Sequence, residues 1–338
     1  MDHHHEPPQA GVMHVIAGYW LSQAVYVAAR LKIADAVGDG NKALGDIARE
    51  TGTKLDPLKR TMRALTSHGF FRQDETGAFF QTPLSETLRS GRPKSMRAIA
   101  EAELGHDHYQ SWGELESCLR EGGTAFERKY GMPIWQYYAK HPEIEVLFGE
   151  AMSNLTEIAN MGIVHSYEFA PFGFAIDIGG GHGGLLSSVL ERHPRARGMI
   201  FDLPTVIDEA VAGDAVARHR DRLETLAGDF FEKVPSGGDL YLLKFILHDW
   251  DDDRCVTILS NIRKAMSPSG RLAVIEIVLP ERSEPHVGPL IDLNMMVMTG
   301  GRERTKGEYG TLLSRAGFRL QNTVGTKSPF SVIEAVPV

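Results

Sequence analysis

Five apolar runs in the second half of the sequence each end in residues that can do chemistry. The runs span 174–184, 198–204, 223–231, 239–250 and 272–280. At their ends stand a glycine loop, Asp202, Asp229, His248 and Glu276. In an open parallel α/β sheet, ligands bind beyond the carboxyl ends of the strands. One polar group at a strand end is ordinary, whereas five in succession predict a functional site.

The glycine loop has the pattern Asp177-x-Gly179-x-Gly181-x-Gly183, directly between a predicted strand and a predicted helix. Glycines there permit a tight turn and let a ligand approach the backbone closely. The pattern favours an adenosine-type cofactor, either NAD or S-adenosylmethionine. Asp202 ends the next strand and can accept hydrogen bonds from two ribose hydroxyls, which both cofactors carry.

Asp229 and Phe230 end the third run. The pair suits an adenine ring, because the carboxylate can accept a hydrogen bond from the exocyclic amine while the aromatic side chain packs on the ring. The alternative is an ordinary turn or helix-capping aspartate.

His248 follows the fourth run, where a general base that titrates near neutral pH would be useful. Glu276 lies inside the apolar segment VIEIV, where a charge is costly unless it is paired. By the order of the βαβ units, its strand is the neighbour of the one that leads to His248. A carboxylate bonded to one ring nitrogen would leave the other nitrogen as the base. The alternatives are a structural histidine, and a pairing of Glu276 with a buried arginine.

Strands alternate with helical stretches from residue 173 onward, as at 183–194 and 251–268. This alternation predicts a doubly wound α/β sheet. A helix over 305–318 and two apolar strands close the chain.

The first half of the sequence has a different pattern of predicted elements. Apolar spacing predicts one long helix over 11–37, then helices over 43–52 and 55–69 and a two-stranded hairpin over 70–83. This is the outline of a winged helix. It raises a DNA-binding hypothesis, because the second short helix carries basic residues, namely Lys54, Lys59, Arg60 and Arg63. The alternative is a solvated face on a dimerisation module, and the formal net charge of −8 favours that alternative.

Residues 93–166 are predicted to be entirely helical and rich in aromatic and methionine side chains, which suit either a core or the wall of an apolar pocket. We therefore predict four parts. They are a disordered tail over 1–10, a winged-helix-like dimerisation domain over 11–92, a helical connector over 93–166 that lines a substrate pocket, and a catalytic domain over 167–338.

Composition narrows the class of protein. The 338 residues include only two cysteines, which predicts no disulfide framework and fits a reducing cytoplasm. We expect no apolar run that can span a bilayer, because polar residues interrupt 11–37, the nearest approach.

Taken together, LLKFILHDWDDD, DIGGGHG, FDLP, GDFF and GGRERT resemble one family, the dimeric S-adenosylmethionine-dependent O-methyltransferases. These include caffeic acid, hydroxyneurosporene and acetylserotonin enzymes and bacterial antibiotic-tailoring relatives. The similarity covers about residues 14–336. It implies a class I methyltransferase sheet with an antiparallel last strand, and an N-terminal domain that forms a homodimer rather than binding DNA.

The resemblance implies roles for residues of this sequence. It assigns the cofactor to Gly179, Gly181, Asp202, Leu203, Asp229, Phe230 and Lys244. It makes His248 the base, flanked by Glu276 and Glu303. It places toward the acceptor Phe148, Met152, Trp250, Asp292, Asn294 and Met295. His182 departs from the small hydroxyl residue that is common in this loop, which puts only local contacts to the cofactor's amino-acid portion in doubt.

The leading hypothesis is methylation of a hydroxyl, expected to be phenolic, on an aromatic or polycyclic secondary metabolite. S-adenosylmethionine is the expected cofactor, S-adenosylhomocysteine its product, and no metal, nucleic acid or membrane is expected to take part. One alternative is a relative that has diverged to S-adenosylmethionine-assisted hydroxylation or decarboxylation. An NAD-dependent dehydrogenase is disfavoured because no hydride-transfer set is apparent, and a winged-helix regulator is disfavoured by the charge.

Overall fold

The computed structural model describes residues 7–338. The chain folds into two compact units. Unit 1 holds residues up to Tyr109 together with Pro142–Leu155, and unit 2 holds Gln110–His141 and Thr156–Val338. The predicted connector over 93–166 is therefore divided between the two units.

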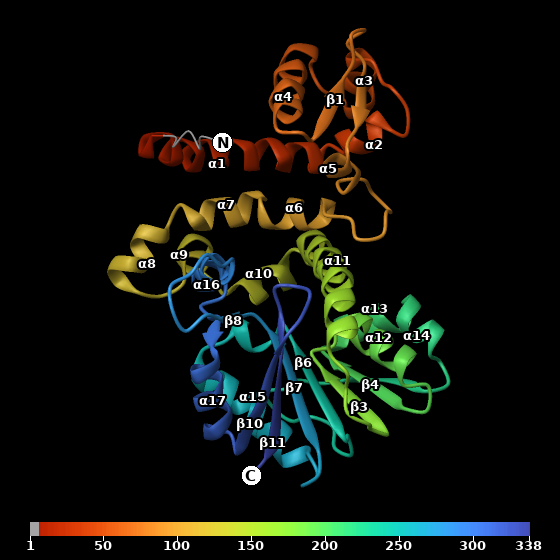
Figure 1. Ribbon diagram of the computed structural model, residues 1–338, viewed down its shortest axis with the longest axis vertical. Helices are drawn as coiled ribbons and strands as arrows, with labels where there is room; N and C mark the ends of the chain where they lie inside the picture. Colours follow the sequence, from red (N-terminus) through yellow and green to blue (C-terminus); the bar gives the residue numbers. More distant parts are fainter. Residues whose placement is uncertain (1–6) are drawn as a thin grey trace, which may run out of the picture. The chain divides into compact units, whose positions relative to one another are not determined.

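Unit 1 begins with helices and a hairpin (Figure 1). Its elements are α1 (Pro8–Arg30), α2 (Ile33–Val37), α3 (Leu44–Thr51), α4 (Leu55–Ser67), β1 (Phe71–Gln73), β2 (Phe79–Gln81), α5 (Pro83–Glu86) and α6 (Arg97–Glu103). The predicted single helix over 11–37 is wrong at one point. Lys32 adopts a left-handed backbone with φ 52°, and this separates α1 from α2.

The hairpin and the two short helices of the winged-helix outline are confirmed, and β1 pairs antiparallel with β2. The disordered tail predicted over 1–10 is wrong for residues 8–10, because α1 begins at Pro8, a residue type favoured at the first helical position. Residues 1–6 of that tail lie outside the part that the structure describes.

The expectation about bilayer-spanning runs also needs correction. Among the described residues, α1 alone is long and apolar enough to cross a membrane by length and composition. Its outer face exposes large apolar side chains, namely Val12, Met13, Val15, Ile16, Tyr19 and Trp20. Length and composition do not distinguish a spanning helix from one that packs on another protein chain.

Residues 93–166 form helices, as predicted. After α6 come α7 (His106–Trp112), α8 (Leu115–Glu121), α9 (Ala125–Tyr130), α10 (Ile134–Lys140) and α11 (Pro142–Ser166). Both α7 and α11 cross the division between the units.

A seven-stranded sheet organises unit 2, in the order β10-β11-β7-β6-β3-β4-β5. Its strands are β3 (Phe174–Ile178), β4 (Arg197–Asp202), β5 (Leu223–Ala227), β6 (Leu240–Lys244), β7 (Arg271–Glu276), β10 (Phe318–Gly325) and β11 (Ser331–Pro337). From β5 to β7 all pairs are parallel, whereas β11 is antiparallel to both β7 and β10. The predicted α/β sheet with an antiparallel last strand is confirmed.

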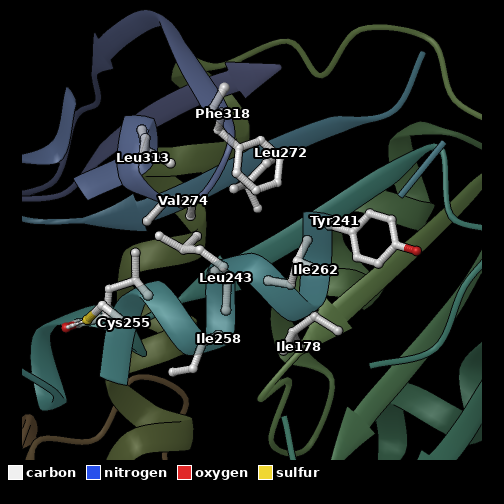
Figure 2. Close-up of a cluster of buried hydrophobic side chains, with 14 of the residues drawn as sticks. Ile178, Tyr241, Leu243, Cys255, Ile258, Ile262, Leu272, Val274, Leu313 and Phe318 are labelled. Carbon is white, nitrogen blue, oxygen red and sulfur yellow. Dashed lines mark hydrogen bonds between the residues drawn. The ribbon is translucent and has the colours of Figure 1, made fainter. Parts of the chain in front are cut away.

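Helices cover both faces of this sheet (Figure 1). They are α12 (Gly184–Arg192), α13 (Pro204–Val211), α14 (Asp214–Arg218), α15 (Asp252–Ala265) and α17 (Lys306–Arg315). Helix α16 (Gly288–Met298) instead contacts α9 and β8. Successive strand residues alternate between the two faces. Leu243 and Val274 pack with α15 and α17, whereas Leu242 and Ile275 pack with α12. Figure 2 shows the first of these cores, in which Ile258 and Ile262 of α15 meet side chains from the strands.

A small second sheet extends the carboxyl end of β7. There β8 (Val278–Leu279) pairs in parallel with β9 (Arg304–Thr305), with Val278 opposite Arg304. Since Glu276 lies two residues before Val278 and Glu303 immediately before Arg304, this pairing brings two glutamates that are far apart in sequence to the same edge.

Candidate active site

The glycine loop joins β3 to α12 at the carboxyl edge of the sheet. Gly179 has φ +67°, a left-handed backbone that favours glycine, and its N–H donates to the carbonyl of Phe201 at 2.8 Å. A Cβ at this position would collide with the side chain of Ile246 and would lie 3.7 Å from Phe230. The loop is thus bare backbone beside an aromatic ring, as an adenosine-type cofactor needs.

Asp202 ends β4 and supports this loop. Its Oδ2 accepts from the N–H of Gly181 at 2.8 Å, and its Oδ1 accepts from the N–H of Leu203 at 2.7 Å. Burial raises the pKa of Asp202, and these two amide bonds oppose the rise. Because a carboxylate has about four acceptor positions, the same side chain can still bind a pair of hydroxyls.

Asp229 lies two residues beyond the end of β5, where its Oδ1 accepts from the N–H of Phe231 at 2.7 Å. This is the turn geometry that the sequence left open as an alternative. Phe230 packs edge-on against Trp250, with ring centroids 6.4 Å apart. Trp250, predicted to face the acceptor, therefore lies next to a residue predicted to face the cofactor.

Lys244 ends β6 as a buried cation. Its Nζ donates to Thr156 Oγ1 at 2.6 Å and lies 3.9 Å from the centre of the Phe245 ring. Burial lowers the pKa of Lys244 and raises the pKa of Asp177, while the attraction between the two opposes both shifts. Thr156 was not identified from the sequence, because it comes from α11, outside every motif.

His248 does not end a strand as predicted. The strand stops at Lys244, Phe245 adopts φ 59°, and His248 lies in a short 3₁₀ turn over Leu247–Asp249. Its Nδ1 lies 2.9 Å from Oε1 of Glu303 and 3.5 Å from Oε2 of Glu276. Glu303, not Glu276, thus makes the short bond to the ring. The side chain of His248 keeps 16% of its surface exposed.

Glu276 is fully buried at the end of β7. Its Oε1 accepts from the N–H groups of Ile246 and Leu247, both at 2.9 Å. Glu276 therefore holds the backbone of the turn that carries His248, as well as facing the ring. The buried arginine of the alternative, Arg304, pairs instead with Asp252 at 2.7 Å.

Three carboxylates determine the electrostatics around His248. Burial lowers its pKa, but Glu276, Asp249 and Glu303 oppose this and raise the pKa of His248 to about 10. Burial likewise raises the pKa of Asp249 to about 6, against the attraction of His248. A further carboxylate, Asp292, accepts from the N–H of Glu303 at 2.9 Å and so helps to place Glu303.

Helix α16 carries the predicted acceptor residues Asp292, Asn294 and Met295, all partly buried. Trp112 Nε1 donates to Asn294 Oδ1 at 3.0 Å. An indole N–H can only donate, so this contact fixes which end of the amide is the acceptor. Trp112 was not identified from the sequence, because it lies 182 positions from Asn294.

Phe148 and Met152, also predicted to face the acceptor, lie on the part of α11 that belongs to unit 1. There Met152 packs against Ala98, Ala102 and Ala151. Their role toward an acceptor stays a prediction.

The cluster of His248, Glu276 and Glu303 also has the spacing of a cation site, because one ligand atom from each lies within 4.8 Å of the others. A proton on Nδ1 accounts for the same arrangement. The expectation of metal-free chemistry stays a prediction.

A cavity of about 460 Å³ opens elsewhere, at the amino ends of β3, β6 and β7, lined in part by Tyr167, Arg271 and Glu334. None of the predicted site residues line it. Because open parallel sheets bind ligands at their carboxyl ends, we assign the active site to the edge that carries the glycine loop and His248.

The residues at that edge fit S-adenosylmethionine better than a dinucleotide. The backbone at Gly179 leaves room for a ligand. Asp177 and Asp202 lie at the loop, where Asp202 accepts from the N–H of Gly181, and acidic side chains suit a sulfonium and an amine rather than a pyrophosphate.

Comparison with known proteins agrees with this chemistry. Residues 112–319 match the O-methyltransferase domain model, and residues 13–91 match the O-methyltransferase dimerisation domain model, which supports a homodimer. The chain is 43% identical over 332 residues to a phenazine O-methyltransferase of Lysobacter antibioticus, covering 98% of this chain and 97% of the relative.

Solved structures are similarly close. The crystal structure of LaPhzM superposes with a TM-score of 0.95 at 43% identity, covering 98% of this chain and 100% of that one. A structure of the neocarzinostatin-biosynthesis O-methyltransferase NcsB1 was determined with S-adenosylmethionine and 2-hydroxy-5-methyl naphthoic acid. It matches with a TM-score of 0.80 at 31% identity, covering 94% of this chain and 96% of that one. This chain belongs to the O-methyltransferase family and is an S-adenosylmethionine-dependent methyltransferase.

Proposed function

We propose that the protein methylates a phenolic hydroxyl of an aromatic or polycyclic secondary metabolite, with His248 as general base. The observation that carries this proposal is the 2.9 Å contact between His248 Nδ1 and Glu303 Oε1. It engages one ring nitrogen and leaves Nε2 as the atom that can take a proton from an acceptor.

A phenol is a poor nucleophile until its proton leaves, and the transfer is a direct displacement that needs an aligned oxygen. S-adenosylmethionine, when bound, supplies the methyl group as a sulfonium. His248 removes the acceptor proton onto Nε2, and Glu303 and Glu276 stabilise the imidazolium that forms. A positioned base contributes about 10²–10⁴-fold, which corresponds to about 3–5 kcal/mol of barrier.

The raised pKa of His248 suits this acceptor class. A simple phenol has a pKa of about 10. Because its carboxylate neighbours raise its pKa, His248 is a stronger base than a free imidazole and takes the phenolic proton with a smaller uphill step. The proton then stays among the buried carboxylates. An aliphatic alcohol is a far weaker acid, so the site is better matched to phenols.

For the cofactor, we propose contacts with Gly179, Gly181, Asp202, Leu203, Asp229, Phe230 and Lys244. The two ribose hydroxyls would bind the carboxylate of Asp202, and the adenine would lie between Asp229 and Phe230. His182, which departs from the residue common at this loop position, contacts Glu209 beside the loop. Its Nε2 lies 3.1 Å from Glu209 Oε2.

For the acceptor, we propose Trp250, Asp292, Asn294 and Met295, with Phe148 and Met152. Relatives whose names give a substrate act on aromatic or polycyclic molecules, among them phenazine, which favours a fused-ring acceptor made in antibiotic or other secondary metabolism. We expect the enzyme to act in the cytoplasm, as a homodimer, without nucleic acid, membrane or metal.

The test is incubation with methyl-labelled S-adenosylmethionine and a panel of phenols, including hydroxyphenazines, hydroxynaphthoates and hydroxybenzoates. The expected product gains one labelled methyl on oxygen. A product that gains a hydroxyl or loses carbon dioxide without the label would instead support the diverged hydroxylation or decarboxylation activity. Label found on nitrogen would contradict the hydroxyl acceptor.

A further inference from the structure

We propose that Arg304 is a positioning residue, which holds the turn carrying His248 and aligns Glu303 with the imidazole. The inference rests on the proposed role of His248 as base. Arg304 touches neither ring nitrogen of His248 and acts through the backbone around it.

Arg304 is 1% exposed and is among the largest fully buried side chains of residues 7–338. Its Nη1 donates to the carbonyl of Leu247 at 3.0 Å, and its Nη2 donates to the carbonyl of Trp250 at 3.0 Å. These two carbonyls lie on either side of His248 and Asp249. One guanidinium therefore fixes both ends of the turn over residues 247–250, which carries His248 and is called the catalytic turn below.

The backbone N–H groups at the start of the same turn are also bound by a buried side chain. Glu276 Oε1 accepts from the N–H groups of Ile246 and Leu247. A buried cation thus binds the carbonyls of residues 247 and 250, and a buried anion binds the amides of residues 246 and 247. Both ends of the His248 segment are fixed by charge-assisted hydrogen bonds, which are about twice as strong as neutral ones.

Arg304 is itself held in place by Asp252, whose Oδ1 accepts from both Nε at 3.0 Å and Nη2 at 2.7 Å. Attraction to the buried guanidinium is part of what lowers the pKa of Asp252, against burial, which raises it. Asp252 is in the first turn of α15, so the helix that follows the catalytic turn is tied to the same side chain.

Arg304 also aligns Glu303, which immediately precedes β9. The side chain of Arg304 reaches the carbonyls of Leu247 and Trp250. The side chain of the preceding residue, Glu303, bonds instead to Nδ1 of His248. Upstream, the N–H of Arg302 donates to the carbonyl of His248 at 2.8 Å. A Cβ at Gly301 would overlap that same carbonyl, so only glycine permits this close approach. All four residues of the 301–304 segment therefore contact the turn that carries His248.

This arrangement requires an arginine. Its planar fork presents five N–H donors and can reach Leu247, Trp250 and Asp252 together, whereas the single ammonium of lysine cannot span carbonyls in separate directions. A misplacement of about 1 Å far from the chemistry can cost about 10²-fold in rate. We therefore expect a loss of turnover without a matching loss of cofactor affinity.

The experiment compares Arg304→Lys, Arg304→Met and Gly301→Ala in the full chain. The control is Arg315→Met, which removes an exposed ion pair between Arg315 of α17 and Asp253 of α15 and touches no carbonyl of the turn. For each protein we would measure kcat and KM against pH, and the Kd for S-adenosylhomocysteine by calorimetry. The binding stoichiometry from the same titration gives the fraction of protein that is folded and able to bind.

For Arg304→Lys we expect kcat to fall by about 10–100-fold, with the Kd changed less than threefold. As Glu303 moves away from the ring it raises the pKa of His248 less, so the ascending limb of the pH profile, which reports the loss of the proton from His248, should shift to lower pH. Gly301→Ala should show the same pair of effects without removal of a charge. Arg315→Met should match the parent protein.

An unchanged kcat in both Arg304 variants would overturn the proposal. So would a kcat that falls equally at every pH, because fewer folded molecules would produce that result. The His248→Ala variant distinguishes failure of the positioning role of Arg304 from failure of the proposed role of His248 as base. If that variant keeps full turnover, the proposed base is wrong; if it is inactive while the Arg304 variants are normal, only the positioning role is wrong.

Discussion

Glu303 Oε1 lies 2.9 Å from Nδ1 of His248, although 55 residues separate the two along the chain. The pairing of β9 with β8 accounts for this proximity, because it sets the residue before Arg304 beside the end of β7, where Glu276 faces the same ring. The base thus has one carboxylate bonded to its nitrogen and a second that also binds the backbone of its turn.

Removal of the Glu303 charge should shift the pH dependence of the enzyme. Below the pKa of His248 the ring is protonated and cannot accept a proton, so kcat/KM should rise with pH toward the value of about 10 that the carboxylates impose. Glu303→Gln removes one cause of that raised pKa, so the rise should occur at lower pH. Profiles for the two proteins check this; a limb that stays in place would contradict the contact.

Loss of the imidazole should separate binding from chemistry. His248→Ala should lower kcat by about 10²–10⁴-fold and leave the Kd for S-adenosylhomocysteine nearly unchanged, because no predicted cofactor residue is altered. Single-turnover assays and calorimetry check the two quantities. Turnover that survives intact would remove the base assignment.

The sequence predicted the site's cofactor edge more fully than its acceptor side, for a physical reason. Strand endings such as Asp202 are local features, and βαβ order fixes which strands are neighbours, so Glu276 could be placed near His248 from pattern alone. Glu303 could be placed only by the family resemblance, since a two-residue strand such as β9 has no periodicity to read.

Some functional residues were not identified from the sequence because their contacts are with residues far away in the chain. Nothing in the sequence around Arg304 shows that it is buried, because its partners are backbone carbonyls 54 and 57 positions away. Trp112 likewise acts only through its contact with Asn294. The apolar pattern continues through Lys32, so it did not predict the left-handed backbone that ends α1 there.

Asp202 should control cofactor affinity. Asp202→Ala removes the acceptors for the N–H groups of Gly181 and Leu203 and the predicted partner of the ribose hydroxyls. We expect the Kd for S-adenosylmethionine to rise at least tenfold, about 1.4 kcal/mol, since hydrogen bonds to a charged group contribute about 1.5–3 kcal/mol. Asp253→Asn, at an exposed carboxylate, is the charge-matched control. Equal Kd values in the two variants would contradict the assignment.

Chelation should leave turnover unchanged. If Nδ1 of His248 carries a proton bonded to Glu303, no ion is needed to hold the three groups together, and a metal on Nδ1 would fix the proton on Nε2 and block the base. Activity after dialysis against a chelator should equal that of the untreated enzyme. Activity that is lost and then restored by one divalent ion would show that the cluster is a metal centre.

The apolar face of α1 should determine the oligomeric state. Val15 is 78% exposed and Trp20 57% exposed on the helix that begins the match to the dimerisation domain. A charge there should oppose burial against a second copy, so Val15→Glu should shift the protein from dimer toward monomer in sedimentation velocity. Gln9→Glu, at an exposed polar position on the same helix, introduces the same charge and should remain dimeric. A Val15→Glu protein that stays dimeric at micromolar concentration would place the dimer interface elsewhere on the chain.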